Sequence, residues 1–381
     1  MNLSAFRFAT AAEIRFGRGE ARRAVPDLAR LGRAVLLVHG ASAARADWLR
    51  DALTGEGCAV TNFAVSAEPD IALITAGVLA AREANARAVI AIGGGAAIDA
   101  AKAISALVPA TRPIHDHLEV VGKGLPLDLD PLPFAALPST AGTGAEVTRN
   151  AVIAVPEARR KVSLRDARML PRLAVVDPSL TDGCPRAVTL ASGLDALTQV
   201  IEPYLCTQAN AVTDALCLSA IENGLPALMT LMECEDGRAR DAMAWTSLCG
   251  GLALANAGLG VVHGLAGPLG GLSGASHGAI CGALLPHGLA ANAARATGDT
   301  ARRIDRVKHC LANALSTSPD NAFSSLAEWS RHAGLPRLDA QGVTAEHRAT
   351  AARMAASSSS MKANPVPLDP AALAEIMDKA R

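Results

Sequence analysis

Apolar runs alternate with amphipathic segments over the first 182 residues, and this alternation limits the possible folds more than any other feature of the chain. The segments between the runs have helical composition, as at 69–86. Strands that are apolar on both faces and alternate with helices form a parallel sheet covered on both sides. The sequence therefore predicts an α/β domain whose strands lie at 33–40, 58–65, 86–95, 133–138 and 173–178.

The strand pattern ends near residue 182, and the remaining chain reads as helices. Segment 213–232 repeats apolar residues every three or four positions, which is typical of one helical face; we expect Gly224 and Pro226 to kink or split it. The polar, Pro-rich stretch 357–370 predicts a connector before a short last helix. A chain of 381 residues is too long for one ordinary core, so we expect an α/β domain at 1–182 and a helical domain at 183–381.

Composition narrows the class of partner. The chain has 36 Lys and Arg against 36 Asp and Glu, with no basic cluster, so it lacks the electrostatic footprint of a nucleic-acid or anionic-membrane protein. Its eight cysteines have no CxxC spacing, and the N-terminus has no apolar leader, so we expect reduced thiols and a cytoplasmic protein. The uncharged segment 242–294 contains many glycines and Pro268, which argues against a membrane span.

Two Gly- or hydroxyl-rich turns follow strands. GGGAAIDAAK (93–102) opens a helix, and PSTAGTGAEVT (138–148) supplies Ser139, Thr140 and Thr143. Helix N-termini with approachable backbone N–H groups bind anions, and doubly wound sheets bind nucleotides beyond the carboxyl ends of their strands. The two turns together favour a diphosphate site. The spacing is not GxGxxG, and the alternative is that the glycines only allow tight packing.

The stretch 259–288 contains His263 and His277 and no Asp, Glu, Lys or Arg. A buried imidazole without a partner costs several kcal/mol, so each ring must bond a neighbour or a metal. Asp195 and Gln199 lie four residues apart in a helical segment and so share a face. One carboxylate and two imidazoles from three segments match a catalytic metal site with an open position. The ordinary alternatives are hydrogen-bonded core histidines and a solvated or N-capping carboxylate.

With these segments in this order, the chain resembles the iron-containing alcohol dehydrogenase family, which is related to glycerol dehydrogenase and dehydroquinate synthase. The resemblance implies a dinucleotide-binding domain at 1–182, a helical metal and substrate domain at 183–381, NAD or NADP, a divalent ion such as Fe or Zn, and a homodimer. It implies hydride transfer between the cofactor and an alcohol or aldehyde. The motifs that carry it are GGGAAIDAAK, PSTAGTGAEVT, KVSLRDARMLP (161–171), VVDP, GLDALT, HGLAGPLGG and MKANPVPL.

The resemblance also implies roles for individual residues. Asp195, His263 and His277 match catalytic metal ligands, and Gln199 stands where the family usually has a fourth ligand, a histidine. A neutral amide there can still offer a weak oxygen ligand, and it suits zinc or a hard divalent ion better than tight iron binding. Cofactor positions are matched by Gly94, Gly95, Ala96, Asp99, Ser139, Thr140, Thr143, Asn150 and Lys161.

A second departure is Gly267, where the family usually has a histidine implicated in catalysis. We therefore expect poor activity on simple primary alcohols and a preference for larger substrates. The first strand ends in Val38, His39 and Gly40, without the carboxylate that bonds the ribose of NAD and repels a 2′-phosphate. We expect weak discrimination between the two cofactors or a preference for NADP, with Arg45 in reach of the phosphate.

Three alternatives stay open from the sequence. One is maleylacetate reductase-like reduction of an acidic enone or keto acid, which a set of arginines would favour. Another is a dehydroquinate synthase-like cyclase or lyase that uses NAD transiently. The third is a binding protein without catalysis. The arginines concerned are Arg149, Arg159, Arg160, Arg165, Arg168 and Arg172.

Overall fold

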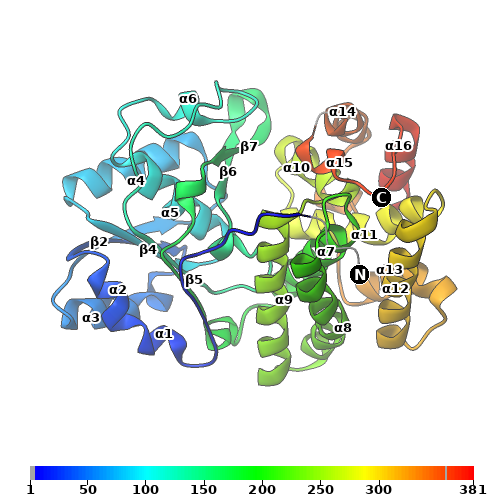
Figure 1. The fold of residues 1–381 in the computed structure, drawn as a ribbon, viewed down its shortest axis with the longest axis horizontal. Coiled ribbons are helices and arrows are strands. Elements are labelled where there is room, and N and C mark those ends of the chain that lie inside the picture. Colours follow the sequence, from blue (N-terminus) through cyan, green and yellow to red (C-terminus); the bar gives the residue numbers. More distant parts are fainter. Residues whose placement is uncertain (1–4, 357) are drawn as a thin grey trace. The chain divides into compact units, whose positions relative to one another are not determined.

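The computed structural model describes residues 5–356 and 358–381. Contacts divide the chain into two compact units (Figure 1). The α/β unit comprises Ala9–Thr140 and Gly144–Asp182. The helical unit comprises Gly183–Arg381, the short segment Ala141–Thr143 and the described part of Met1–Phe8.

The α/β unit is built on a six-stranded parallel sheet in the order β1-β8-β5-β4-β2-β3. The predicted α/β fold class is therefore confirmed, with a parallel sheet in this unit and helices in the other. The sheet strands are β1 (Ile14–Phe16), β2 (Ala34–Gly40), β3 (Ala59–Val65), β4 (Ala88–Gly93), β5 (Phe134–Pro138) and β8 (Leu173–Val176).

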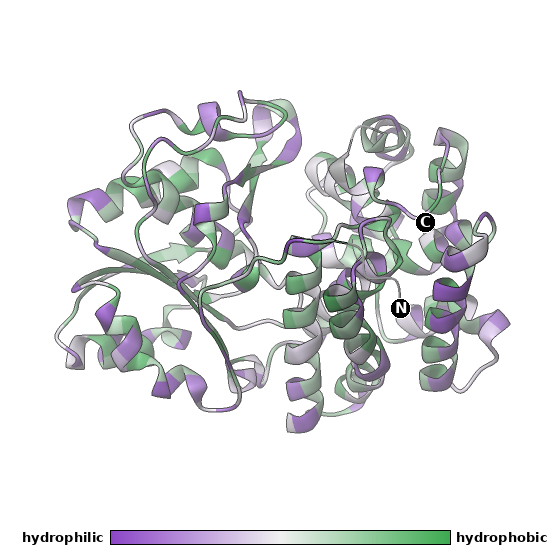
Figure 2. Cartoon of the chain, viewed as in Figure 1, coloured by the Kyte–Doolittle hydropathy of each residue, from purple (hydrophilic) through white to green (hydrophobic). Residues whose placement is uncertain are grey.

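Both faces of the sheet are covered, which explains the continuous apolar runs. Leu36 and Val89 face a core shared with α4 and α5, whereas Val35 and Ile90 face a second core shared with α1, α2 and α3. The strands in Figure 2 are mostly green, and purple residues lie on the helices around them. The helices are α1 (Glu20–Arg23), α2 (Val25–Arg30), α3 (Asp47–Gly55), α4 (Ile71–Glu83), α5 (Gly95–Leu107) and α6 (Ile114–His117).

An antiparallel hairpin that the sequence reading did not anticipate completes this unit. It consists of β6 (Asn150–Val155) and β7 (Arg160–Arg165), and it packs on α5. The Asp99 carboxylate on α5 accepts a hydrogen bond from Val152 N at 3.0 Å. A side chain of the sheet-covering helix therefore holds the hairpin in place.

The helical unit is organised around α7, which packs against α8, α9 and α11. Most of α7 is buried, so this helix can carry side chains into the centre of the unit. The helices are α7 (Arg186–Leu205), α8 (Ala211–Glu233), α9 (Gly237–Asn256), α10 (Val261–Ser273), α11 (His277–Ala293), α12 (Gly298–Leu315), α13 (Ala322–His332), α14 (Ala345–Ala355), α15 (Ser359–Lys362) and α16 (Pro370–Lys379).

The expected split of the 213–232 helix is wrong, because α8 runs unbroken through both Gly224 and Pro226. A Cβ on Gly224 would lie 2.9 Å from atoms of Leu197 and Thr246, so this glycine lets α8 approach its neighbours closely. By length and hydropathy α8 could cross a membrane, but half of its apolar window is buried inside the protein. Its packing between α7 and α9 is that of a core helix.

The segment predicted as a polar connector precedes a short last helix, α16, as expected, but part of it is buried. Within 357–370, Ala363 and Asn364 are buried. Asn364 Oδ1 accepts hydrogen bonds from Val261 N at 2.9 Å and from Asn292 Nδ2 at 3.3 Å. The polar composition of the segment suggested solvent exposure, but Asn364 instead accepts a hydrogen bond from the first turn of α10.

Candidate metal centre and dinucleotide site

Three polar side chains share one face of α7. Asp195, Gln199 and Glu202 follow each other at spacings of four and three residues, which places them on one side of a helix. All three are buried, with 2–5% of their surface exposed. Because a buried charge is costly unless it is paired, this face needs partners from neighbouring helices.

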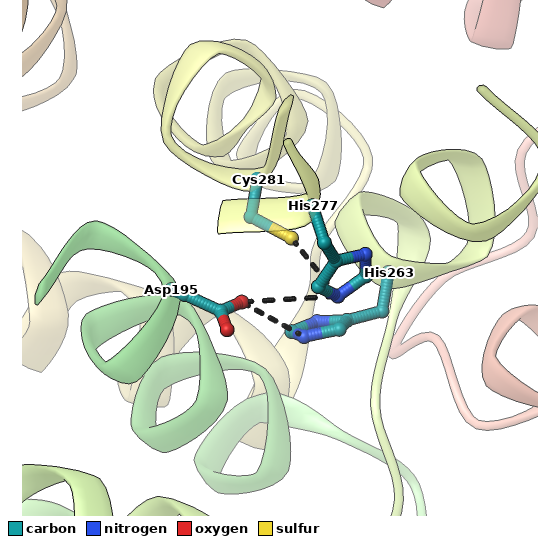
Figure 3. Close-up of side chains that lie close together, drawn as sticks. All are labelled: Asp195, His263, His277 and Cys281. Carbon is teal, nitrogen blue, oxygen red and sulfur yellow. Dashed lines mark hydrogen bonds and ion pairs between the residues drawn. The ribbon is translucent and has the colours of Figure 1, made fainter. Parts of the chain in front are cut away.

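Helices α10 and α11 bring the two histidines to this face (Figure 3). His263 Nε2 lies 3.6 Å from Asp195 Oδ1, and His277 Nε2 lies 3.8 Å from the same oxygen. Glycine permits the approach of α11, since a Cβ on Gly278 would lie 2.5 Å from Ala191 O of α7. The structure thus brings together the three residues singled out as metal ligands.

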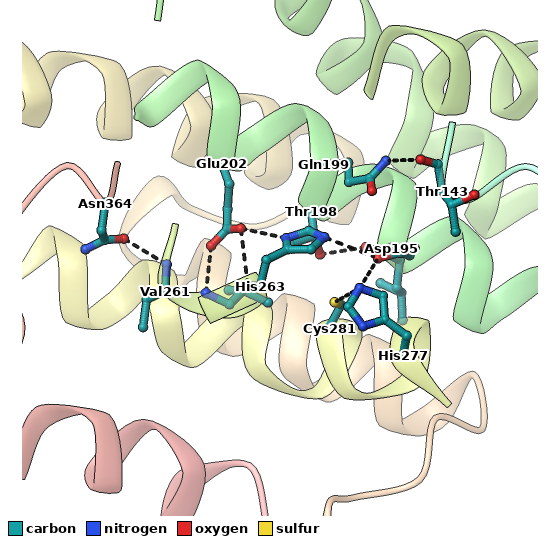
Figure 4. A network of polar contacts seen from close by, with 12 residues as sticks. Thr143, Asp195, Thr198, Gln199, Glu202, Val261, His263, His277, Cys281 and Asn364 are labelled. Atoms are coloured by element: carbon teal, nitrogen blue, oxygen red, sulfur yellow. Dashed lines mark hydrogen bonds and ion pairs between the residues drawn. The ribbon is translucent and has the colours of Figure 1, made fainter. Parts of the chain in front are cut away.

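Glu202 holds the start of α10, and sequence reasoning missed it. Its carboxylate accepts hydrogen bonds from Val262 N at 2.7 Å, from His263 N at 3.3 Å and from His263 Nδ1 at 2.7 Å (Figure 4). An anion at a helix N-terminus is favoured by the unpaired N–H groups and the helix dipole. The available signal was its position seven residues after Asp195 on the same helical face.

The hydrogen bond to Glu202 determines which nitrogen of His263 is free for an ion. A carboxylate only accepts, so Nδ1 carries the hydrogen, and the neutral ring presents a lone pair at Nε2. Both Nε2 and Asp195 Oδ1 are buried without a hydrogen-bond partner. Two acceptors that face each other at 3.6 Å are satisfied by a cation between them. These residues therefore fit the divalent ion that the resemblance implies.

The electrostatics of Asp195 agree with this arrangement. Burial opposes ionisation of the carboxyl, but the neighbouring His263, His277 and Cys281 side chains outweigh burial and lower its pKa. An ionised carboxylate is the form that binds a metal.

Cys281 joins the cluster, one turn after His277 on α11. Its Sγ lies 3.7 Å from His277 Nε2, and one ligand atom from each of Asp195, His263, His277 and Cys281 lies within 4.8 Å of all the others. Burial raises the pKa of this thiol to about 12. The sequence reading grouped Cys281 with ordinary core cysteines, although its four-residue spacing from a candidate ligand was visible.

Gln199 has its amide nitrogen committed elsewhere. Nε2 donates to Gly142 O at 3.3 Å and to Thr143 O at 2.9 Å (Figure 4). Only Oε1 is left for an ion, so coordination by Gln199 stays a prediction.

Gly267 lies in α10 one turn after His263, and a Cβ there would meet nothing within 4 Å.

The glycine-rich turn of the α/β unit lies where the sheet topology changes direction. The chain passes from β3, on one side of β2, to β4 on the other, and such switch points hold nucleotides. A Cβ on Gly93 would lie 2.7 Å from Ala97 Cβ and 3.3 Å from Gly40 N. Side chains larger than hydrogen would therefore fill the space between these strand ends.

Gly94 caps α5 without a side-chain hydrogen bond, so the N–H groups of Gly95 and Ala96 head a helix whose start is left for an anion. Thr140 approaches this turn, because its Oγ1 would lie 3.3 Å from a Cβ on Gly94. Ser139 N donates to Gly93 O at 2.8 Å, which joins the two predicted turns. These residues fit a dinucleotide diphosphate.

Asp99 and Asn150, which were predicted near the cofactor, both lie beside Lys102. Lys102 is fully buried and donates to Ala145 O at 2.7 Å, to Thr148 Oγ1 at 2.8 Å and to Asn150 O at 2.8 Å. Burial lowers the pKa of Lys102 to about 8 and raises that of Asp99, 3.8 Å away, to about 6. Lys102, the last residue of the GGGAAIDAAK motif, had no predicted role, and the structure shows that it ties the 145–150 turn to α5.

Lys161 Nζ lies 3.4 Å from Glu68 Oε2, so this predicted cofactor residue has a carboxylate partner. Two of the arginines that would favour an acidic substrate are also paired. Arg165 bonds Glu119 at 2.9 Å, and Arg168 bonds Asp166 at 2.8 Å and Asp130 at 3.0 Å. Their charge is therefore partly compensated within the protein.

Comparison with known proteins gives matches over most of the chain. Residues 11–178 match the family profile described as iron-containing alcohol dehydrogenase, and residues 189–381 match the one described as Fe-containing alcohol dehydrogenase family, C-terminal. Alcohol dehydrogenase 4 of Saccharomyces cerevisiae is 40% identical over 59% of this chain and 58% of its own length.

Two further matches extend over longer regions. Lactaldehyde reductase of Escherichia coli is 36% identical over 70% of each chain. A crystal structure of a 1,3-propanediol oxidoreductase superposes with a TM-score of 0.90 at 27% identity, covering 99% of this chain and 100% of the other.

Proposed function

The chain belongs to the iron-containing alcohol dehydrogenase family, a family of metal-dependent, NAD(P)-linked oxidoreductases, and from this premise we propose that it interconverts an alcohol and the corresponding aldehyde. The carbon-bound hydrogen leaves the alcohol with its electron pair for the nicotinamide, and the hydroxyl hydrogen leaves as a proton. The observation that carries the proposal is the unpartnered, buried pair of acceptors, His263 Nε2 and Asp195 Oδ1, 3.6 Å apart.

Asp195, His263 and His277 would hold the divalent ion, which supplies a Lewis acid for the carbonyl oxygen. Asp195 contributes the negative charge of this set. Glu202 fixes the orientation and tautomer of His263 through the 2.7 Å hydrogen bond to Nδ1. Metal-bound histidines generally have such a partner on the other ring nitrogen.

Gly94, Gly95, Ala96 and Thr140 would cradle the diphosphate of the dinucleotide, which carries the hydride. The uncapped start of α5 offers backbone N–H groups there, and the missing side chains at the glycines let phosphate approach. Asp99 and Lys102 support this region by fixing the hairpin and the 145–150 turn. We propose that the α/β unit is the cofactor domain and the helical unit the metal domain.

The substrate is a small alcohol or aldehyde. We propose a homodimer in the cytoplasm, which sedimentation of the purified protein and fractionation of cells would test. Arg165 and Arg168, two of the six arginines that would favour the maleylacetate reductase-like alternative, are paired with carboxylates and so weaken that alternative.

The test measures cofactor oxidation by zinc- or iron-loaded protein with a panel of short and bulky aldehydes. We expect loss of the reduced-nicotinamide absorbance with wild type. Asp195→Asn should lower both metal content and rate by at least about a hundredfold, because the amide keeps the shape but lacks the charge. Asp305→Asn, which changes an exposed carboxylate on α12, is the matched control and should change neither. Metal-loaded wild type that oxidises no reduced cofactor with any aldehyde would overturn the proposed function.

A further inference from the structure

The candidate metal cluster contains a donor, Cys281, that neither the sequence analysis nor the proposed function uses. Cys281 is fully buried, and its Sγ lies among the ligand atoms of Asp195, His263 and His277, all within 4.8 Å of one another. The ribbons in Figure 3 show why: the cysteine and His277 leave α11 on successive turns and point toward Asp195 on α7. Cys281, one helical turn after His277, thus adds a sulfur donor to the oxygen of Asp195 and the two histidine nitrogens.

Three of the separations between these atoms match those around a tetrahedral ion. With oxygen and nitrogen ligands at about 2.0–2.1 Å, a tetrahedral ion separates them by about 3.4 Å, and a sulfur at about 2.3 Å lies about 3.6 Å from each. The structure has 3.6 Å and 3.8 Å for the two nitrogen–oxygen pairs and 3.7 Å for the sulfur–nitrogen pair. An octahedral ion would instead need about 2.9 Å between adjacent ligand atoms.

We propose that Cys281 is the fourth protein ligand of the ion, in place of a ligand from position 199, and that a substrate oxygen would add as a fifth ligand, an expansion that catalytic zinc sites allow. The Gln199 amide nitrogen is occupied by the carbonyls of Gly142 and Thr143, whereas the sulfur faces the other donors. On binding, the S–H bond breaks, the proton goes to solvent and the thiolate electron pair is donated to the ion.

A sulfur in the set changes which ion the site prefers. Thiolate and imidazole together suit zinc, a borderline-soft ion that is tetrahedral in most protein sites, better than they suit iron(II). We infer that this chain selects zinc over iron(II), and that it does so through a cysteine rather than through the amide at 199. This inference deepens the proposed function and rests on the same ion site.

The alternative is that Cys281 is a neutral core thiol that only donates a weak hydrogen bond to Asp195. The other buried cysteines show the surroundings of such a core thiol. Cys249, for instance, is fully buried on α9, and only burial raises its pKa. Cys281 differs because two nitrogens and a carboxylate face its sulfur. The two cysteines therefore make a matched pair of substitutions.

The first measurement uses wild-type protein, so it does not depend on a variant that folds. X-ray absorption at the zinc edge should show a sulfur shell at about 2.3 Å beside a shell of oxygen and nitrogen at about 2.0–2.1 Å. Replacement of zinc by cobalt(II) should produce a near-ultraviolet thiolate-to-cobalt charge-transfer band. A zinc site with only oxygen and nitrogen neighbours and no such band overturns the proposal.

The second measurement compares Cys281→Ser with Cys249→Ser. Loss of the charge-transfer band and a fall in zinc affinity of about a hundredfold or more are expected for Cys281→Ser, since even partners outside the ligand set change affinity 10–100-fold. Cys249→Ser should keep both. Equal behaviour of the two variants overturns the proposal. These readouts need no turnover. Wild-type protein that shows the sulfur shell but reduces no aldehyde would refute only the proposed function. Active protein without the sulfur shell would refute only the assignment of Cys281 as a ligand.

Discussion

Replacement of Glu202 by Gln tests how the protein prepares His263 for the ion. Oε1 accepts from Val262 N, and Oε2 accepts from both N and Nδ1 of His263. An amide has one acceptor and one donor end. If the amide oxygen stays at the Val262 side, the NH₂ group faces Nδ1, and the ring must move its hydrogen to Nε2, the atom that faces Asp195. That tautomer has no lone pair for an ion.

The opposite orientation of the amide is no better. The NH₂ group would then face the N–H of Val262 in a buried site, and an unpaired buried donor costs about 1–3 kcal/mol. Either orientation should lower zinc affinity about 10–100-fold, the range found when the hydrogen-bond partner of a ligand is changed. The same range corresponds to about 1.4–2.7 kcal/mol, so the two estimates agree.

Competition with a chelator of known affinity measures the loss, and histidine ¹⁵N chemical shifts report the tautomer of His263. Glu222→Gln is the control, because it makes the same change at a half-exposed glutamate on α8. Glu202→Asp, which keeps the charge, should recover part of the affinity. If Glu202→Gln binds zinc within about threefold of wild type with Nδ1 still protonated, the tautomer argument is refuted.

Three further outcomes can be measured. Gly267→His should raise turnover of short aldehydes by about 10²-fold or more, because the position is open and general acid–base help is typically worth 10²–10⁴; efficient wild-type turnover of acetaldehyde with an unchanged size preference in the variant would contradict it. Burial raises the pKa of Glu146 to about 7 from 4.5, so the folded state retains a proton that the unfolded chain releases, and stability should fall as pH rises from about 4.5 to about 7; Asp99, whose pKa burial raises to about 6, adds to this fall, so urea unfolding at pH 5 and 8 should show a loss that is about 2–3 kcal/mol smaller for Glu146→Gln than for wild type. Specificity constants should differ little between NAD and NADP or favour NADP. Arg45 is exposed after β2, and Arg45→Glu should reduce any preference for NADP; a thousandfold preference of wild type for NAD would contradict the expected cofactor use.

The α/β fold was predictable because burial on both faces of a parallel sheet leaves continuous apolar runs, as at β2 and β4. The hairpin of β6 and β7 was not, because KVSLRDARMLP is polar and half exposed, and its place depends on a tertiary bond from Asp99. Local composition cannot reveal that bond.

The candidate site was also only partly predictable, because some of its residues are recognised only through tertiary contacts. His263 and His277 stood out because their surroundings are otherwise free of charge, and Asp195 because of its helical neighbours. Glu202 and Cys281 were missed because each acts through a residue distant in sequence: Glu202 through the first turn of α10, 60 positions away, and Cys281 through α7. The helical spacings were visible, but only packing shows which faces meet.

Charge balance explains why a core helix carries Asp195 and Glu202 at all. Two buried carboxylates within two turns of α7 repel each other in a medium that screens poorly, and leaving either one unpaired would cost several kcal/mol. Glu202 is compensated by the N–H groups that begin α10, whereas Asp195 has an unpartnered oxygen and two imidazoles beside it. Packing alone would favour apolar side chains at both positions. A divalent ion would remove the cost at Asp195, and Glu202 orients the imidazole that would share this ion. The two carboxylates would therefore act together, because the first would supply charge to the ion and the second fixes the ring of the neighbouring ligand.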